Sequence, residues 1–534
     1  MPTVRTQLHH LVARMAEQRG DAPAVTFKDR TLSYARLWEA VDEVAAGLQA
    51  LGVRRGERIA VYLDKGIETV LAIFGASAAS AVFVPVNPLL RSRQVAHILA
   101  DCDVRVLVTS PERLALLQDD LDRCKSVEHV VLVGTAGESG RDPVVAPGRD
   151  GVLTWDDLCQ AGSGGAVDLG DIDLDMAAIL YTSGSTGSPK GVVFSHRNLL
   201  VGAESVTSYL RNVPDDVILS VLPLSFDAGF SQITTAFHVG AHVVLMNYLL
   251  PADVVTLCAR HGVTGLTGVP PLWNQLTDVE WSPEAVRSVR YIANTGGRMP
   301  LVTLDKLRRL FADADPYLMY GLTEAFRSTY LDPAEVDRRP DSIGKAIPNA
   351  EILVVRPDGS LCDPGEPGEL VHRGALVTLG YWNDPERTAE RFRPAPGRDE
   401  ALTVGELAVW SGDTVVRDEE GFLYFVSRMD DMIKSSGYRI SPTEVEEAVY
   451  ETGLVRDVVA LGLEDLRLGQ RIVVVVTGAD GAAVDTRLLV KLLRSKVPHW
   501  MVPSEVIVRE ELPRSANGKF DRSGLRRELT EVAQ

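Results

Sequence analysis

Residues 181–196 read YTSGSTGSPKGVVFSH, a stretch rich in Gly, Ser and Thr that also carries one Lys and one Pro. The apolar run MAAIL at 176–180 precedes it, and GVVFSHRNLL at 191–200 reads as a strand followed by a helix. Glycine lets backbone N–H groups approach a phosphate closely, while hydroxyls and a lysine add further donors. A flexible linker has a similar composition, but it would not be fixed between a strand and a strand–helix unit. The stretch therefore predicts a phosphate-binding loop within a sheet.

The loop does not fit the P-loop of the Walker A type. That motif needs Gly directly before its Lys and Ser or Thr directly after it, so that the hydroxyl can bind Mg²⁺. Here the order is Pro189, Lys190, Gly191. The spacing therefore excludes a P-loop NTPase.

Strand and helix patterns alternate through the first 400 residues. Helical spacing of apolar residues is seen at 34–52 and 252–263. Nearly continuous apolar strands that alternate with helices predict a parallel α/β sheet buried on both faces. Short β-branched strands are expected at 58–63, 105–110, 129–134, 217–223, 242–247 and 289–296.

The pattern changes near residue 351 to β-rich segments with tight turns such as PDG and EEG. After residue 440 a tail of helix, strand, strand and helix follows, with the size of a small independent domain. We place the boundary at Asp430, which gives an N-terminal domain of residues 1–429 and a C-terminal domain of residues 430–534.

Length and charge limit the function classes. A chain of 534 residues is expected to hold several domains, since a domain has about 100–200 residues. The net charge of −18 and the pI near 5.1 argue against duplex nucleic acid as a partner, because that surface needs a basic face. A phosphate-bearing ligand must be held by local cations and backbone dipoles.

Cysteine use and hydropathy favour a cytoplasmic protein. The five cysteines are scattered without a CxxC pair, which indicates neither a disulfide framework nor a zinc site. The N-terminal segment has no unbroken apolar core of a signal peptide. The most apolar run, 70–86, is interrupted by small residues and predicts a buried helix leading into a strand, not a membrane span.

At this point a resemblance becomes specific. YTSGSTGSPKG at 181–191 is similar to the phosphate-binding signature of the acyl-adenylate-forming superfamily, which includes acyl-CoA synthetases, carrier-protein ligases, amino-acid adenylation domains and firefly luciferase. Further motifs follow in the family's order and cover most of the chain. They are LMYGLTE at 318–324, GELVHRGALVTLGYWNDPERT at 368–388, the block at 410–446 and PRSANGKFDR at 513–522.

The resemblance implies a fold and a reaction. The fold would have two stacked, mostly parallel α/β subdomains and a distorted β-barrel in the large domain, followed by a small mobile α+β lid. In this family a carboxylate attacks the α-phosphorus of ATP with Mg²⁺ present, giving an acyl-adenylate and pyrophosphate. A thiol of CoA or of a carrier protein's phosphopantetheine then displaces AMP. Such a ligase in lipid or natural-product metabolism would act on a small-molecule carboxylic acid, with a carrier protein as a possible partner.

The family's catalytic roles fall on four residues. Lys519 would contact the substrate carboxylate and the α-phosphate, although by spacing alone it is an exposed loop lysine. Glu324 would hold Mg²⁺, and Thr323 would donate to the α-phosphate. The alternative interpretation is that both residues only stabilise a helix N-terminus, Glu324 by its negative charge and Thr323 as the capping hydroxyl. Lys434, in the block at 410–446, is a further catalytic candidate.

A larger set would bind the nucleotide. Asp413 and Arg428 resemble the pair that holds the ribose, and a surface ion pair is the alternative interpretation. Tyr320 would line the adenine or belong to the core. One departure is Ser427, where the family usually has Gly. The nucleotide-binding candidates are Thr182, Ser183, Gly184, Ser185, Thr186, Gly187, Lys190, Gly296, Gly297, Arg298, Tyr320, Gly321, Asp413 and Arg428.

Asp430 aligns with the family's hinge. About this residue the lid would swing between two closed states, bringing Lys519 in for adenylation and the loop at 435–437 in for thiol transfer. A charged residue at a domain boundary is otherwise unremarkable. The hinge is therefore an expectation drawn from the resemblance.

The acyl pocket is expected around 222–237. Asp227 is also compatible with an amino-acid adenylation enzyme, because relatives of that kind anchor the substrate amine with an Asp; a helix cap explains it equally well. The surrounding residues favour a bulky, largely apolar acid. The chain could also be an enzyme that hands its adenylate to a partner, or a silent relative, which would have lost Lys519 or Glu324. The pocket candidates are Phe226, Asp227, Gly229, Phe230, Gly268 and Leu322.

Overall fold

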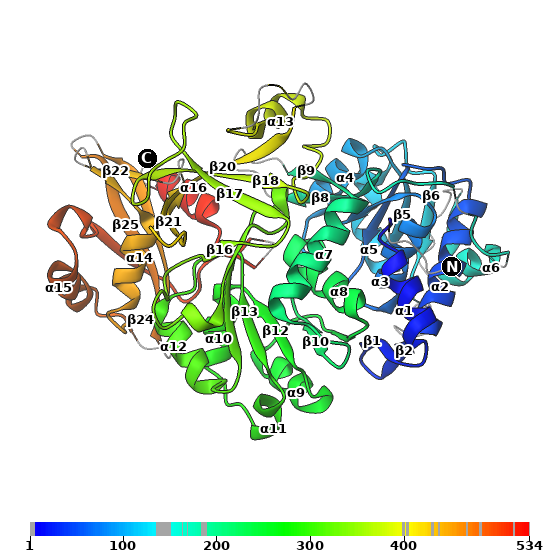
Figure 1. The fold of residues 1–534 in the computed structure, drawn as a ribbon, viewed down its shortest axis with the longest axis horizontal. Helices are drawn as coiled ribbons and strands as arrows, with labels where there is room; N and C mark the ends of the chain where they lie inside the picture. The colour runs from blue at the N-terminus through cyan, green and yellow to red at the C-terminus, as the bar shows by residue number, and fades with distance from the viewer. Residues whose placement is uncertain are drawn as a thin grey trace.

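The structure is a computed structural model of the 534-residue chain. It describes residues 6–532 except 135–150, 163, 168, 183–188, 398–400, 402–404, 429–431, 436–437, 466–467, 480–482 and 516–517. These described residues form four sheets, three in the large domain and one in the C-terminal domain (Figure 1).

The first sheet contains the strand that leads into the Gly/Ser/Thr loop. Its strands are parallel except for the last one, β9, which pairs antiparallel with β8. In spatial order the strands are β7 (Val152–Thr154), β6 (His129–Leu132), β5 (Val104–Thr109), β3 (Arg58–Tyr62), β4 (Val82–Pro85), β8 (Met176–Thr182) and β9 (Lys190–Ser195). The helices of this part are α1 (His10–Arg19), α2 (Tyr34–Ala50), α3 (Ile67–Ala78), α4 (Ser92–Asp101), α5 (Pro111–Leu121) and α6 (Trp155–Ala161).

The second sheet has six consecutive parallel strands with antiparallel strands at both edges. Its order is β16 (Lys345–Ala346), β15 (Thr329–Leu331), β14 (Asp315–Tyr320), β13 (Tyr291–Asn294), β12 (Gly265–Gly268), β10 (Val217–Ser220), β11 (His242–Leu245), β1 (Pro23–Phe27) and β2 (Arg30–Ser33). Its helices are α7 (His196–Leu210), α8 (Asp227–Val239), α9 (Pro251–His261), α10 (Pro270–Thr277), α11 (Pro283–Arg287) and α12 (Leu301–Leu310).

The two α/β subdomains stack through one continuous core that includes α3 and α8. Phe74 of α3 packs edge-on against Phe237 of α8, with ring centres 5.3 Å apart. Phe230 of α8 approaches Phe83 of β4 at 5.2 Å. Aromatic pairs at such distances stabilise a core beyond the area that they bury. The core therefore fixes the second sheet against the first.

The third sheet is the β-rich part that the sequence predicts after residue 351. Its five strands are antiparallel and correspond to the distorted barrel of the expected fold. They are β17 (Ala350–Val355), β18 (Pro367–Gly374), β19 (Phe392–Pro394), β20 (Leu407–Arg417) and β21 (Leu423–Arg428), with α13 (Pro385–Arg391) beside them.

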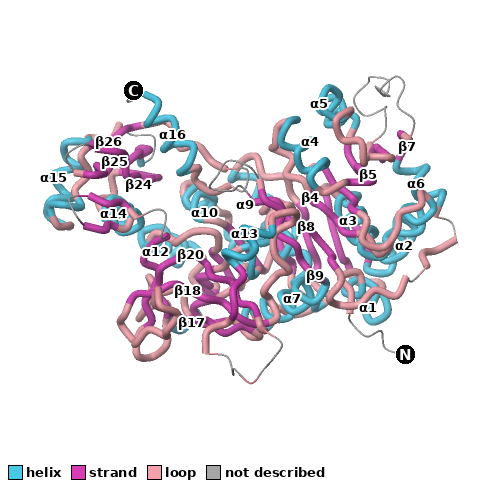
Figure 2. The backbone as a smooth tube through the Cα atoms, turned by 90° about the horizontal axis from the view of Figure 1, so that it is seen from above, coloured by secondary structure: helices cyan, strands magenta, loops and turns pink. Residues whose placement is uncertain are grey.

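The C-terminal domain is a separate sheet with helices, which lies against one end of the large domain (Figures 1 and 2). Its strands are β22 (Ile433–Ser435), β23 (Tyr438–Ile440), β24 (Val455–Asp465), β25 (Gly469–Gly478) and β26 (Glu505–Val508). Its helices are α14 (Pro442–Tyr450), α15 (Thr486–Lys496) and α16 (Arg522–Val532).

The predicted fold class is confirmed, and each of the six strands expected in the first 400 residues is present with its ends at most three residues from the predicted ones. The apolar run at 70–86 forms part of α3 and β4, as predicted. In the described part of the chain, no helix combines the length and apolarity needed to cross a bilayer. The expected hinge, Asp430, lies outside the described residues.

Candidate active site

The predicted site residues gather where the parallel strands of the second sheet end. Tyr320 is the last residue of β14 and Gly268 the last of β12, while Gly296 follows β13 and Asp227 begins the helix after β10. In open α/β sheets, ligands bind outside the carboxyl ends of the strands. The topology therefore brings these separate motifs to one edge.

Lys519 reaches this edge from the C-terminal domain. Its Nζ lies 5.1 Å from the centre of the Phe226 ring, within cation–π range. A Cβ placed on Gly296 would lie 2.8 Å from the Lys519 Cε, and Gly296 has a φ of 75°, which favours glycine. The absence of a side chain at Gly296 thus gives Lys519 room at the strand ends.

Polar contacts between the two domains hold Lys519 there. The Asn274 amide of α10 donates to the Asp457 carboxylate of β24 at 2.9 Å, and both residues are buried. The backbone N–H of Leu301 donates to Glu447 of α14 at 3.2 Å. Burial raises the pKa of Glu447, and the nearby Arg298 guanidinium opposes that rise. Buried interdomain hydrogen bonds of this kind fix the orientation of a docked domain.

Glu324 sits in a cationic and hydroxyl environment that keeps it ionised. Lys190 Nζ lies 3.1 Å from Glu324 Oε1, and the Tyr381 hydroxyl donates to the same oxygen at 2.5 Å. Lys190 also donates to the Tyr381 hydroxyl oxygen at 2.8 Å. Burial alone would raise the pKa of Glu324, but the Lys190 ammonium and the Tyr381 hydroxyl outweigh it and hold that pKa below its usual range. The carboxylate is therefore available as a hard oxygen ligand.

Thr323 precedes Glu324 at the start of a short 3₁₀ helix, η1 (Thr323–Ala325). Its hydroxyl donates to Asp227 Oδ1 at 3.3 Å, and Arg327 Nη1 lies 3.8 Å from Asp227 Oδ2. Burial raises the pKa of Asp227, and the charges of Arg327 and Lys519 oppose that rise. Asp227 and Arg327 are both buried, with 4% and 2% exposure. A buried ion pair of Asp227 and Arg327 therefore lies at the strand ends, where the charge of Lys519 acts on it.

Tyr320 and Asp413 come together although they belong to different sheets. The Tyr320 hydroxyl donates to Asp413 Oδ2 at 2.6 Å, and Asp413 is buried. In β20 and β21, Asp413 is the Cα partner of Arg428, whose side chain lies outside the described residues. The backbone thus pairs the two positions that were predicted to hold a ribose.

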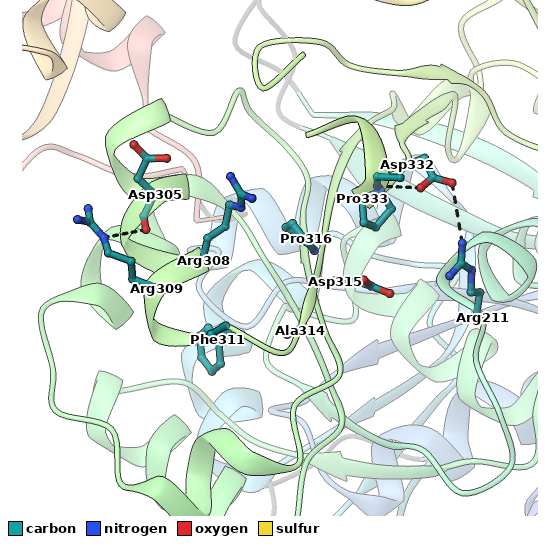
Figure 3. Close-up of a pocket in the computed structure, with 12 residues that line it drawn as sticks. Arg211, Asp305, Arg308, Arg309, Phe311, Ala314, Asp315, Pro316, Asp332 and Pro333 are labelled. Atoms are coloured by element: carbon teal, nitrogen blue, oxygen red, sulfur yellow. Dashed lines mark hydrogen bonds and ion pairs between the residues drawn. The ribbon is translucent and has the colours of Figure 1, made fainter. Parts of the chain in front are cut away.

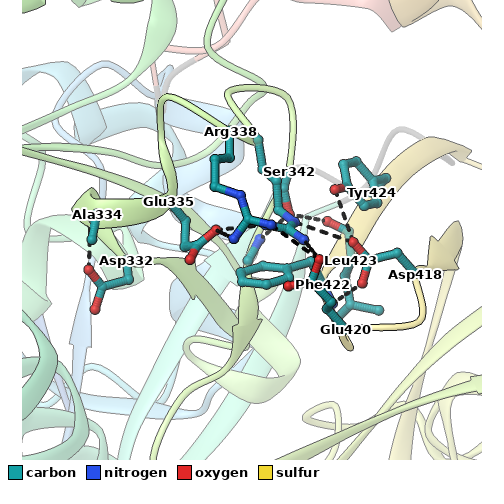
Figure 4. A network of polar contacts seen from close by, with 12 residues as sticks. Asp332, Ala334, Glu335, Arg338, Ser342, Asp418, Glu420, Phe422, Leu423 and Tyr424 are labelled. Atoms are coloured by element: carbon teal, nitrogen blue, oxygen red, sulfur yellow. Dashed lines mark hydrogen bonds and ion pairs between the residues drawn. The ribbon is translucent and has the colours of Figure 1, made fainter.

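A charged network connects the β20–β21 hairpin to the second sheet (Figure 4). Arg339 is buried and donates to Glu335 at 2.7 Å and to Asp418 at 3.4 Å, and it also pairs with Glu420. Tyr424 donates to the Asp418 carboxylate at 3.2 Å. Several charges joined in one network fix geometry better than isolated surface pairs do. The network therefore sets the position of β20, and with it Asp413, relative to β14.

The Gly/Ser/Thr loop connects β8 to β9, as its sequence predicts. Thr182 and Lys190, at the two ends of the loop, are Cα partners in the antiparallel pair. The hydroxyl of Thr182 is buried and has no hydrogen-bond partner among the described residues. The loop candidates Ser183, Gly184, Ser185, Thr186 and Gly187 lie outside the described residues, as does the side chain of Lys434.

The pocket candidates have different surroundings. A Cβ on Gly229 would lie 1.9 Å from the Pro223 carbonyl oxygen, and one on Gly268 would lie 2.8 Å from the Trp273 ring. Phe226 belongs to a buried apolar cluster that includes Trp273. Of the other pocket candidates, Phe230 is fully buried in the core between the sheets, and Leu322 packs against that core. Two nucleotide-binding candidates, Gly297 and Gly321, lie beside Pro270 and Arg327.

A hollow of about 670 Å³ lies elsewhere in the large domain (Figure 3). Its lining includes Asp315, the first residue of β14, together with Arg211, Arg308 and Asp332. It therefore opens near the amino end of β14, whereas Tyr320 stands at the carboxyl end. The predicted nucleotide residues do not line it.

Sequence reasoning missed four residues that the structure places at the site. Tyr381 lies within the motif at 368–388, Arg327 follows the motif at 318–324, and Asn274 and Asp457 join the domains. The segment AFRSTYL at 325–331 could have indicated that Arg327 has an acidic partner, because an arginine in a strand-like run is rarely buried without a charged partner. The sequence around Asn274 and around Asp457 gives no indication that these two residues contact each other.

Comparisons with known proteins agree with the geometry. A family model for the AMP-binding enzyme matches residues 12–382, and one for the AMP-binding enzyme C-terminal domain matches residues 444–519. The chain is 30% identical over 554 residues to the long-chain-fatty-acid–CoA ligase of Salmonella typhimurium, covering 99% of this chain and 94% of that protein. It is 29% identical over 523 residues to gramicidin S synthase 2 of Aneurinibacillus migulanus; the match covers 96% of this chain and 11% of that protein.

Among solved structures, the anthranilate CoA ligase AuaEII in complex with anthranoyl-AMP has the same fold, with a TM-score of 0.86 at 22% identity over 99% of both chains. The chain belongs to the AMP-binding enzyme family, within the acyl-adenylate-forming superfamily. It is an AMP-forming acid–thiol ligase of the acyl-CoA synthetase type.

Proposed function

We propose that this ligase activates a bulky, largely apolar carboxylic acid with ATP and Mg²⁺, and then forms a thioester with CoA. The observation that carries the proposal is the position of Lys519 beside Gly296 and Phe226. The lysine comes from the small domain, yet its ammonium lies at the strand ends of the large one. A cation held in place before the reaction stabilises charge that develops while the adenylyl group of ATP is transferred to the carboxylate.

Each residue has a defined task in the adenylation step. Lys519 orients the substrate carboxylate toward the α-phosphorus and offsets charge on the phosphoryl oxygens, while Thr323 donates to them. The new bond joins a carboxylate oxygen to the α-phosphorus, and the bond to pyrophosphate breaks. Asp413, positioned by Tyr320, accepts from the ribose hydroxyls.

Glu324 would hold Mg²⁺. The fit is chemical: Glu324 is an ionised carboxylate, and Mg²⁺ takes one or two carboxylates together with phosphate oxygens. Lys190 holds the carboxylate in place.

The apolar character of the acid is inferred from the cleft wall. Phe226, directly before Asp227, belongs to a buried apolar cluster with Leu222, Val269 and Trp273. Phe226 is also the ring beneath Lys519, so the acyl chain would begin beside it. Burying an apolar chain there gains about 25 cal/mol for each Å² removed from water.

A carrier protein is the second candidate for the thiol acceptor. The match to gramicidin S synthase 2 favours it, although this chain spans 11% of that protein. Pyrophosphate exchange with a panel of acids tests the adenylation step. Adding CoA or a phosphopantetheinylated carrier protein then identifies the acceptor, and release of acyl-AMP without transfer to either would instead support an enzyme that hands its adenylate to another partner.

A further inference from the structure

We infer that the Arg327 guanidinium takes the position beside Asp227 that the α-ammonium group of an amino acid would otherwise take. The pocket therefore accepts acids without an α-ammonium group and rejects their amino-acid counterparts. The inference rests on the proposed function, and it names the substrate class of that same site. It makes Arg327 a specificity-determining residue.

A buried carboxylate at the start of an acyl pocket would ordinarily attract a positive group of the substrate. Asp227 lies 4% exposed at the first turn of α8, and its two oxygens face Thr323 and Arg327. The substrate carboxylate would lie at Lys519, whose charge acts on Asp227. The atoms next to the substrate carboxyl carbon would therefore lie near Asp227.

Arg327 is held firmly in this place. It is 2% exposed, and its Nη1 donates to the Thr295 hydroxyl at 2.8 Å. A Cβ on Gly321 would lie 3.1 Å from the Arg327 Cα, so the glycine makes room for the arginine backbone. Phe326, directly before it, has a φ of 56° and a ψ of −61°, a costly conformation that turns the chain.

The ring of Phe326 is accommodated in turn by Gly202 of α7, where a Cβ would lie 2.5 Å from Phe326 Cδ1. Two glycines and a strained residue thus combine to bring one guanidinium into the cleft. Strain of this kind persists only where the surrounding structure enforces it. The surrounding structure therefore determines the position of Arg327.

Charge balance gives the selectivity. Arg327 Nη1 lies 3.8 Å from Asp227, and the charge of Lys519 also acts on this carboxylate, so a substrate ammonium would add a third positive charge beside it. Like charges repel strongly where water is excluded. In addition, Arg327 Nε is buried and has no acceptor among the described residues, so it favours an oxygen of the ligand over another donor.

Matched acyl-adenylate mimics test this without turnover. The probes are pairs of N-acylsulfamoyl adenosines that differ only in the α-amine: phenylalanyl and 3-phenylpropanoyl, leucyl and 4-methylpentanoyl, alanyl and propanoyl. Calorimetry on the full chain gives the Kd of each. We expect the desamino member of a pair to bind at least about tenfold tighter, equivalent to about 1.4 kcal/mol.

Arg327→Met should move that ratio toward one or below it. The matched control is Arg290→Met, because Arg290 also forms an ion pair with a buried Asp, Asp216, but at the amino ends of the strands. Its ratio should equal that of the wild-type protein. If the wild-type protein binds the amino member equally or more tightly, or if Arg327→Met leaves the ratio unchanged, the inference is wrong.

Asp227→Asn provides a second variant should Arg327→Met fail to fold. It leaves the Arg327 charge unbalanced, so the preference for the desamino member should increase, and an unchanged or smaller preference would contradict the inference. The proposed function is judged separately by ATP binding and acyl-AMP formation. If the wild-type protein neither binds ATP nor forms acyl-AMP, the proposed function is wrong, whichever member of each probe pair binds more tightly.

Discussion

The ammonium of Lys519 in the C-terminal domain lies 5.1 Å from the centre of the Phe226 ring in the large domain. The small domain therefore places a charged group beside residues of the large domain. Since the contact joins two domains, both the lysine and the docking of its domain should matter for activity.

Replacing Lys519 by Ala should reduce acyl-adenylate formation at least about 100-fold, because it removes a cation held at the reacting phosphoryl group. Pyrophosphate exchange measures this step. Lys491→Ala is the matched control, since Lys491 is an exposed lysine of the same domain. Equal exchange rates in Lys519→Ala and the wild-type protein would remove the basis of the proposed function.

Glu324→Gln should raise the Mg²⁺ concentration required for half-maximal exchange and lower the maximal rate about 10–1000-fold, because a neutral amide is a poor ligand for a hard cation. Tyr381→Phe should have a smaller effect, since it removes one of the two groups that hold the carboxylate. Glu386→Gln, at an exposed site on α13, is the control. An unaltered Mg²⁺ requirement in Glu324→Gln would show that the metal is held elsewhere.

Asn274→Ala should slow adenylation more than thioester formation, because it removes the hydrogen bond to Asp457 that docks the C-terminal domain with Lys519 in the cleft. Pyrophosphate exchange reports the first step, and transfer from preformed acyl-adenylate to CoA reports the second. A double-mutant cycle with Asp457→Asn isolates the pairwise coupling, expected at about 0.5–3 kcal/mol. Equal losses in both steps would indicate a general structural role.

Acid should destabilise the protein through its buried histidines. Burial lowers the pKa of His372 to about 3 and of His196 to about 4, whereas an unfolded histidine has a pKa near 6.5. Between these values the unfolded chain binds more protons, so stability is complete above pH 6.5 and falls as the pH drops toward 4. Each such histidine adds a slope of up to about 1.4 kcal/mol per pH unit.

His372→Asn should flatten the pH dependence between pH 6.5 and 5, because Asn keeps a polar atom for the Ser328 hydroxyl but does not titrate. Thermal midpoints over that range measure the change. The wild-type protein, measured over the same pH range, is the reference. A slope that persists in His372→Asn would assign the acid sensitivity to other groups.

The sequence alone predicted the fold class and the order of the elements. Strands such as β3, β5 and β13 and helices such as α2 and α9 are present close to their predicted bounds. Their apolar spacing is a local property of each segment, which is why it can be read without a structure. The motifs likewise predicted that Glu324, Asp413 and Lys519 serve one site, since each motif is a short continuous segment.

Only the tertiary structure decided which of these residues face one another. Lys190 with Glu324, Tyr320 with Asp413, and Asp227 with Arg327 are pairs of residues from separate segments, and their distances depend on how sheets and domains pack. Asn274 and Asp457 carry no local signal of their contact. The physical reason is that burial and charge pairing are properties of the packed chain, whereas periodicity and turn chemistry belong to each segment by itself.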